Sequence, residues 1–201
     1  MVRITNDAEG KVTIGLLEID KGKQAEKEGV RRILKEILGF ETPVLHNEDG
    51  KPMVEGYHIS ITHTIGYVAV ILSRNYEVGI DIEYFSNRVN RIASRFLRCD
   101  EIFTNTLDTL TAWCAKETIY KLFSSEHLAL QEIKVNPQLR TVTNFRQNLT
   151  FEFKCECTPK YILTYTWYQF YLYSLFLRSM NVMLQRALFY YEITPLLVKN
   201  V

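Results

Sequence analysis

The chain has 201 residues, of which 47% are hydrophobic and 23% charged, with 24 Lys and Arg against 23 Asp and Glu. This length suits one domain, or two small halves packed as one unit, and the composition excludes a disordered, collagen-like or linker sequence. The formal net charge of +1 provides no overall attraction to nucleic acid or to an anionic membrane, although the two signs of charge can still be segregated locally.

Cysteine usage and the amino-terminal residues favour a reducing compartment. The first residues lack the apolar run and cleavage site of a secretory signal peptide. Four cysteines are too few and too scattered for a disulfide framework in a chain of this size. We therefore expect a cytoplasmic protein. Cys155 and Cys157, two apart in a predicted strand, should face the same side, and no second pair or nearby histidine completes a zinc site around them.

Hydrophobic periodicity predicts a mixture of helices and strands. Residues 11–18 alternate as in a strand, and residues 23–38 carry apolar side chains at helical spacing until Gly39 ends the helix. After a turn cluster at 47–52, the pattern predicts strands at 57–62, 67–72 and 78–83, helices at 88–97 and 107–123, and strands at 133–135, 149–157 and 161–166.

The last stretch is different in composition. Residues 167–191 are dense in Tyr, Phe and Leu, but their longest apolar run, 170–177, is well short of the ~20 residues of a membrane span. The pattern favours an amphipathic helix that packs on the protein. A helix lying on a membrane surface is the alternative, although few basic residues support it.

One predicted strand places two carboxylates side by side. Val78, Ile80 and Ile82 are expected on its buried face, and Asp81 and Glu83 on the other. Two neighbouring carboxylates can share a hard cation such as Mg²⁺. An ordinary amphipathic strand with a polar outer face explains the same pattern.

Three further features indicate a functional site only when they are taken together, because each has a simpler explanation by itself. Glu117 and Lys121 lie one turn apart on a helix, as a solvated ion pair also would. His63 follows Thr62 near the end of a strand, among hydroxyls that could bind an anion, although a lone histidine is more often structural. Lys51 lies in a stiff turn, where an exposed loop lysine is the simpler interpretation.

The order and spacing of these segments resemble the 4′-phosphopantetheinyl transferase superfamily. The resemblance spans residues 11–166 and is most specific in its last two segments. The segments are Gly-Lys-Pro at 50–52, Ile-Ser-Ile-Thr-His-Thr at 59–64, Val-Ala-Val-Ile-Leu-Ser at 68–73, Gly-Ile-Asp-Ile-Glu at 79–83 and Trp-Cys-Ala-Lys-Glu-Thr-x-x-Lys at 113–121.

The resemblance implies a fold and a domain organisation. It points to an α+β protein of the larger single-chain type, expected to be a monomer, in which two halves form a pseudo-twofold pair. Each half would be a small antiparallel sheet packed on helices. The expected parts are an N-terminal half on the coenzyme A side (1–84), a C-terminal half with the metal and the catalytic helix (85–166) and an aromatic-rich tail (167–201).

The implied reaction is the Mg²⁺-dependent transfer of the 4′-phosphopantetheine arm of coenzyme A to a serine of an apo acyl or peptidyl carrier protein, with Mn²⁺ as a possible substitute. The resemblance assigns metal ligation to Asp81, Glu83 and Glu117 and catalysis to Glu117, Lys121 and His63. It assigns coenzyme A binding to Lys51, Thr62, His63, Lys116 and Arg31, with Arg32 as an alternative to Arg31.

A basic helix offers a docking surface for the carrier protein. Arg91, Arg95 and Arg98 are spaced i, i+4 and i+7, with Arg88 nearby, and would attract an acidic carrier. A solvated helix face explains the arginines equally well. The alternative functions are another metal-dependent phosphotransfer or pyrophosphate-cleaving enzyme, and a non-catalytic module that binds coenzyme A or a carrier. No nucleic acid partner and no transmembrane segment are expected.

Overall fold

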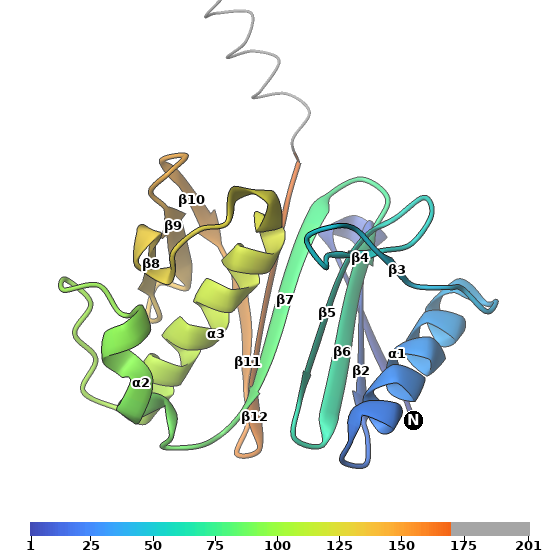
Figure 1. Ribbon diagram of the computed structural model, residues 1–201, viewed down its shortest axis with the longest axis horizontal. Coiled ribbons are helices and arrows are strands. Elements are labelled where there is room, and N and C mark those ends of the chain that lie inside the picture. Colours follow the sequence, from blue (N-terminus) through green and yellow to red (C-terminus); the bar gives the residue numbers. More distant parts are fainter. Residues whose placement is uncertain (170–201) are drawn as a thin grey trace, which may run out of the picture. The chain divides into compact units, whose positions relative to one another are not determined.

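The computed structural model describes residues 1–169, in which helices and small antiparallel sheets make an α+β fold (Figure 1). The tail beyond residue 169, with most of the predicted 167–191 helix, lies outside the described residues. Trp167 and Tyr168 are described, and they continue a strand, so the predicted start of that helix at 167 is wrong. None of the helices in the described part of the chain is long and apolar enough to cross a membrane.

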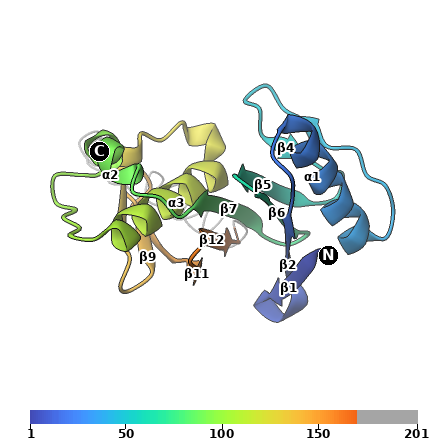
Figure 2. The same cartoon turned by 90° about the horizontal axis from the view of Figure 1, so that it is seen from below.

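The first sheet is antiparallel, with the strand order β1-β2-β6-β5. Helix α1 packs against β2 and β6, and a short β3–β4 hairpin lies next to it (Figures 1 and 2). The elements are β1 (Arg3–Asp7), β2 (Val12–Glu18), α1 (Lys23–Leu38), β3 (Leu45–His46), β4 (Pro52–Met53), β5 (His58–Thr64) and β6 (Tyr67–Ser73).

A second antiparallel sheet has the order β11-β12-β7, and a third has the order β10-β9-β8. Helix α3 contacts β7 and β12 on one side and β8 and β9 on the other, while α2 packs on α3. The elements are β7 (Glu77–Tyr84), α2 (Val89–Phe96), α3 (Thr106–Leu122), β8 (Ile133–Asn136), β9 (Thr141–Asn144), β10 (Leu149–Glu152), β11 (Lys154–Cys157) and β12 (Tyr161–Tyr168).

The first two sheets pack face to face through their alternating apolar side chains. Val78, Ile80 and Ile82 of β7 join side chains of β2, β6 and β12 in one buried cluster, which confirms the predicted buried face of that strand. The opposite face of β7 is therefore turned toward α3. It carries Gly79, whose small size is needed there because a Cβ atom would lie 2.3 Å from the Thr118 carbonyl oxygen.

Strands β5 and β7 lie side by side without a backbone ladder between them. Hydroxyl groups of β5 accept hydrogen bonds from β7 amides instead: Ser60 from Ile80, Thr62 from Ile82 and Thr64 from Tyr84, at 3.4, 3.2 and 3.1 Å. These three bonds join the edge of the first sheet to the edge of the second. Strand β7 makes its backbone ladder with β12, although the expected boundary after residue 84 placed it in the first half.

Most predicted elements are present, with a few differences in extent. The 149–157 segment is two strands rather than one, since Phe153 turns its buried side chain into the core between them. Strands β1 and β9 were not predicted. Cys155 and Cys157 face the same side of β11, as expected, with their sulfur atoms 3.3 Å apart and both thiols free.

Candidate active site

The site is built where β7 crosses α3. The alternation along β7 turns Asp81 and Glu83 toward the helix, and the helical period brings Glu117 and Lys121 to the facing side of α3. Lys121 Nζ lies 2.6 Å from Asp81 Oδ1. The residues predicted as metal ligands and catalytic groups on these two elements are therefore neighbours in the structure.

Asp81 is buried, with only 4% of its surface exposed, and its two oxygens differ. Oδ1 accepts hydrogen bonds from the Thr62 hydroxyl at 3.0 Å and from Lys121 at 2.6 Å. Oδ2 is buried and has no hydrogen-bond partner. Because a buried carboxylate oxygen without a partner is costly, this atom indicates that a donor or a cation binds there.

Glu83 is held by the neighbouring helix. Trp113 on α3 donates its indole N–H to Glu83 Oε1 at 2.8 Å, and the ring of Phe96 packs edge-on against the indole with centroids 4.9 Å apart. Trp113 belonged to the quoted sequence pattern, but sequence reasoning gave it no role. The structure makes it the residue that orients Glu83.

Burial and the nearby Asp81 charge raise the pKa of the two glutamates of the site. Burial, and then the nearby Asp81 charge, raise the pKa of Glu117 to about 7 against the opposing effect of Lys121. Burial and Asp81 also raise the pKa of Glu83. Hard oxygen donors and concentrated negative charge suit a hard divalent cation. Within residues 1–169, however, no three acidic, histidine or cysteine side chains are already arranged to hold a metal ion.

Helix α1 and the β3–β4 hairpin border a cavity of about 790 Å³ that His63 also lines. His63 is exposed, with Nδ1 3.5 Å from Glu26 Oε1. Arg31 lines this cavity, although its guanidinium also lies 2.6 Å from Glu28 Oε1, whereas Arg32 lines a separate cavity.

Lys23 and Lys27 line the same cavity as Arg31 and His63 and were missed in the sequence. Their signal was available, since positions 23, 27 and 31 are spaced i, i+4 and i+8 and so share one face of α1. The cavity therefore has a wall with three cationic side chains.

Lys51 and Thr62, both predicted to bind coenzyme A, are bonded to residues that do not line this cavity. Lys51 Nζ lies 3.2 Å from a Glu77 carboxylate, whose second oxygen is 2.8 Å from His58 Nδ1. The Thr62 side chain bonds Asp81 and the Ile82 amide, whereas its neighbours Ile61 and His63 line the cavity. The structure does not bring the side chains of Lys51 and Thr62 together with His63 at this cavity.

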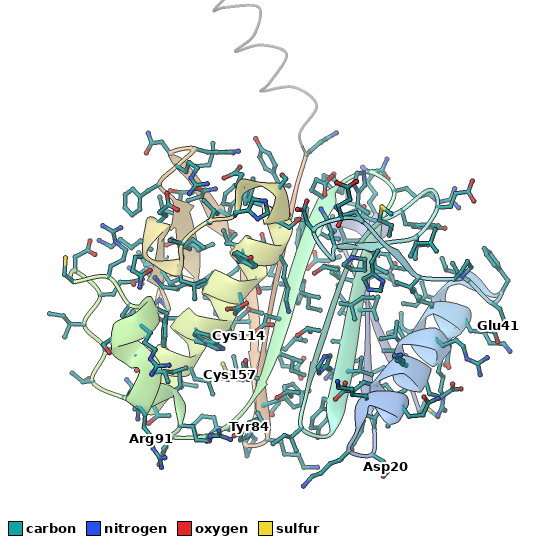
Figure 3. The ribbon with its side chains drawn as sticks, in the orientation of Figure 1. Asp20, Glu41, Tyr84, Arg91, Cys114 and Cys157 are labelled. Carbon is teal, nitrogen blue, oxygen red and sulfur yellow. The ribbon has the colours of Figure 1, made fainter. Side chains whose placement is uncertain are left out.

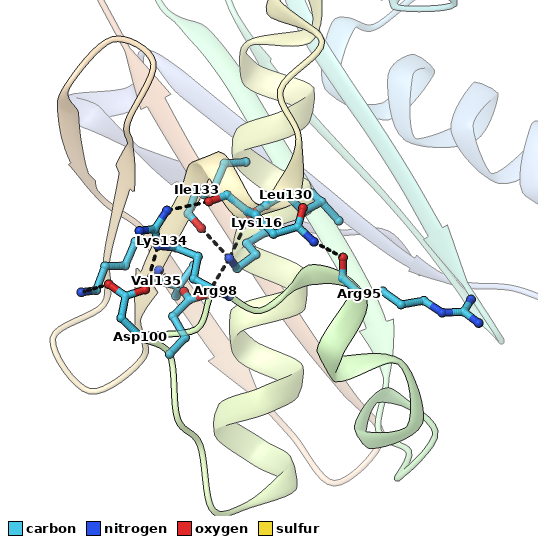
Figure 4. A network of polar contacts seen from close by, with 10 residues as sticks. Arg95, Arg98, Asp100, Lys116, Leu130, Ile133, Lys134 and Val135 are labelled. Atoms are coloured by element: carbon cyan, nitrogen blue, oxygen red, sulfur yellow. Dashed lines mark hydrogen bonds and ion pairs between the residues drawn. The ribbon is translucent and has the colours of Figure 1, made fainter.

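Lys116 lies in a buried network, which Figure 4 shows. Its amino group is 2.7 Å from Glu101 Oε2, donates to the carbonyl oxygens of Leu130 and Ile133, and is fully buried. Burial lowers the pKa of Lys116, and Glu101 opposes that effect. Lys116 thus links α3 to the segment before β8. It does not line the cavity beside α1.

The predicted arginine ridge is partly present. Arg91 extends outward from α2, as Figure 3 shows, and Arg95 is exposed on the same helix. Arg98 lies beyond the end of α2 at Phe96, so the expectation of a continuous i, i+4, i+7 helical ridge is wrong at this residue. Its guanidinium bonds Asp100 at 2.8 Å and the Gln131 carbonyl at 2.7 Å.

The buried face of α3 also contacts β7 directly. Figure 3 shows Cys114 on the side of α3 that faces the sheet, and its sulfur lies 3.2 Å from the Asp81 carbonyl oxygen. Burial raises the pKa of this thiol well above its usual value. Cys114 is therefore a packing residue that holds the two site-bearing elements together.

Comparison with known proteins assigns this region to a family. Residues 77–166, from the start of β7 into β12, match the family model described as the 4′-phosphopantetheinyl transferase superfamily. No curated protein matches the chain. The matched segment contains Asp81, Glu83, Glu117 and Lys121, in the arrangement described above. Over residues 77–166 this chain is therefore similar to the 4′-phosphopantetheinyl transferase superfamily.

Proposed function

We propose that this protein transfers the 4′-phosphopantetheine arm of coenzyme A to a serine hydroxyl of an apo acyl or peptidyl carrier protein, with release of adenosine 3′,5′-bisphosphate. The observation that carries the proposal is the buried Asp81 carboxylate. One of its oxygens is bonded by Lys121 and Thr62, the other is buried without a partner, and the Asp81 charge acts on both Glu83 and Glu117. The family match over the same residues supports it.

The metal would be held by Asp81, Glu83 and Glu117. Oxygen ligands suit Mg²⁺ and also accept Mn²⁺. When bound, such an ion supplies charge neutralisation for a pyrophosphate group. The raised pKa values of Glu83 and Glu117 fit this role, because a cation would offset both the burial and the Asp81 charge that make these carboxyl groups retain their protons.

Glu117 is the proposed acceptor of the proton from the incoming serine. As a ligand of the metal, its carboxylate would lie beside the phosphorus that the serine attacks, within reach of the serine proton. Lys121, one turn further along α3, presents a cation to the same region. It would stabilise or protonate the departing phosphate as negative charge develops on it.

The cavity beside α1 is the proposed site for coenzyme A. Lys23, Lys27 and Arg31 provide a row of cations, and His63 provides a ring nitrogen, for the phosphate groups of an elongated anionic ligand. Arg91 and Arg95 on α2 are the proposed contacts for an acidic carrier protein. We further propose that the protein acts as a monomer in the cytoplasm.

The test combines the purified protein, coenzyme A, Mg²⁺ and an apo carrier protein, and follows both substrates. The proposal predicts that the carrier gains the mass of one phosphopantetheinyl group while adenosine 3′,5′-bisphosphate accumulates in equal amount by liquid chromatography. Cleavage of coenzyme A at the same rate without a carrier would identify a pyrophosphate-cleaving enzyme instead. Binding of coenzyme A without cleavage would identify a non-catalytic module.

A further inference from the structure

Thr62 is placed to serve the carboxylate cluster rather than the coenzyme A cavity. We infer that Thr62 is a positioning residue, which fixes the Asp81 carboxylate so that its free oxygen is presented to a cation. The inference deepens the proposed function and rests on it, because the cation site at Asp81 is part of that proposal. Its evidence is the set of contacts that Thr62 makes on β5.

The Thr62 hydroxyl uses both of its hydrogen-bonding abilities on adjacent residues of β7. Its oxygen accepts the backbone N–H of Ile82 at 3.2 Å, and its proton is donated to Asp81 Oδ1 at 3.0 Å. A hydroxyl has one proton, and the amide occupies an acceptor position, so the proton is directed to the carboxylate. Thr62 therefore bonds both the Asp81 side chain and the backbone of the next residue on β7.

The neighbouring hydroxyls show what is special about Thr62. Ser60 and Thr64 stand two residues before and after it on β5, and each accepts one β7 amide in the same way. Among the contacts that the structure shows for these three hydroxyls, only that of Thr62 reaches an acidic side chain. Ser60 and Thr64 are therefore matched controls for Thr62, because they make the same kind of bond to β7 but do not bond Asp81.

Burial argues against a direct contact between Thr62 and a phosphate group. Thr62 is 4% exposed, whereas His63, the next residue, is exposed and lines the cavity. A phosphate accepts hydrogen bonds, so it could bond the Thr62 hydroxyl only by taking its one proton from Asp81. The phosphate-binding role that the family resemblance implies for Thr62 is therefore replaced by an indirect one.

The contact has a chemical consequence for Asp81. Thr62 and Lys121 together occupy Oδ1, which restrains rotation of the carboxylate about its last bond. Oδ2 is left buried and without a partner. Residues that hold a metal ligand in place through hydrogen bonds commonly contribute tenfold to a hundredfold to metal affinity. We expect the same for Thr62.

The experiment compares Thr62→Val with Thr64→Val in the full-length chain. Both changes remove a hydroxyl that accepts a β7 amide, but only the first releases Asp81. Mn²⁺ binding is measured on the free protein by electron paramagnetic resonance, without coenzyme A. Binding of adenosine 3′,5′-bisphosphate is measured separately by calorimetry without metal.

We expect Thr62→Val to weaken Mn²⁺ binding at least tenfold. Thr64→Val should change Mn²⁺ binding less than threefold, and neither variant should weaken nucleotide binding more than twofold. Thr62→Ser, which keeps the hydroxyl, should restore Mn²⁺ binding to within threefold of the original chain. If Thr62→Val does not fold by circular dichroism, Thr62→Cys replaces it, since a thiol is a weak donor of similar size.

Three results would overturn the inference. Weaker nucleotide binding with normal Mn²⁺ binding in Thr62→Val would make Thr62 a phosphate contact. Equal loss of Mn²⁺ binding in both valine variants, or no Mn²⁺ binding by the original chain, would also overturn it. Failure to modify any carrier, with Mn²⁺ binding that still depends on Thr62, would refute the proposed transfer reaction but leave the positioning role standing.

Discussion

At the scale of single residues, the two carboxylate oxygens of Asp81 have different surroundings and different proposed roles. Oδ1 is bonded by Lys121 and Thr62, and Oδ2 is buried without a partner. Sequence alternation alone brought Asp81 and Glu83 to one face, and helical spacing brought Glu117 and Lys121 to another. That the two faces meet, and that Thr62 bonds Asp81, depends on how β5, β7 and α3 pack, which local patterns do not encode.

Asp81→Asn is predicted to abolish the proposed transfer. The variant keeps the size of the side chain but removes the charge that faces Lys121 at 2.6 Å. We expect kcat to fall at least ~100-fold, as when a group that stabilises transition-state charge is lost. Steady-state kinetics on a carrier measures this change, and activity within tenfold of the original chain would contradict the assignment of Asp81.

Arg31 and Arg32 provide a matched pair for the coenzyme A cavity, because only Arg31 lines it. Arg31→Ala should raise the KM for coenzyme A by about tenfold, the loss expected of a charged hydrogen bond, with little change in kcat. Arg32→Ala should leave the KM within twofold. Equal effects of the two substitutions would place coenzyme A elsewhere.

Glu117 should make the stability of the metal-free protein depend on pH. Its pKa is raised from 4.5 to about 7 in the folded state, so the unfolded chain loses this proton first as pH rises. The folded state is therefore progressively disfavoured between pH 4.5 and about 7, and the cost is complete above pH 7. Allowing for partial solvent screening, this cost is on the order of 1–3 kcal/mol.

Glu117→Gln should remove this cost. We expect its Tm to match that of the original chain at pH 4 and to exceed it by a few degrees at pH 8, measured by calorimetry in the presence of a chelator. Added Mg²⁺ should raise the Tm of the original chain at pH 8 but hardly that of the variant. A Tm difference that is the same at both pH values would exclude a raised pKa as its cause.

At the scale of elements, the sequence was most informative where one face of an element is buried. Helix α1 has its predicted bounds, Lys23–Leu38, because its apolar stripe faces the first sheet and Gly39 ends it with a φ of +84°. Strand β1 was missed because its first four residues are exposed and carry no alternating burial. Arg98 was placed on α2 by spacing alone, but the helix ends two residues earlier.

Lys116 illustrates why side-chain roles were harder to predict than elements. Its position beside Glu117 on α3 suggested a contact with coenzyme A, but adjacent helical residues point in different directions. The lysine enters the core instead, where Glu101 and two carbonyl oxygens satisfy it. Residues 98–101, which supply its acidic partner, could not be matched to it from the sequence.

Lys116→Met is predicted to destabilise the protein by about 3–5 kcal/mol, because the buried Glu101 carboxylate loses its cationic partner. The double variant with Glu101→Gln should recover part of this loss, as measured by urea unfolding. Lys134→Ala, which removes an exposed ion pair with Asp100, serves as the control and should cost less than about 1 kcal/mol. A cost for Lys116→Met no larger than that of the control would contradict the structural role.

At the scale of the whole molecule, the net charge of +1 conceals two opposed local sets of charges. Asp81, Glu83 and Glu117 gather negative charge where β7 meets α3, while α1 lines a cavity with Lys23, Lys27 and Arg31. The basic set lies on α1, which packs on the first sheet, and the acidic set lies on β7 and α3, at the second sheet. The three hydrogen bonds between β5 hydroxyls and β7 amides join these two sheets. An acidic centre for a cation and a basic cavity for phosphates are the two requirements of the proposed reaction.

The most direct test of the central claim is the intact mass of an apo carrier protein after incubation with coenzyme A, Mg²⁺ and either this protein or its Asp81→Asn variant. The proposed function predicts that the original chain adds one phosphopantetheinyl group to the carrier and that the variant leaves the carrier unchanged. A carrier that keeps its apo mass with the original chain, or gains the group equally with both proteins, would contradict it.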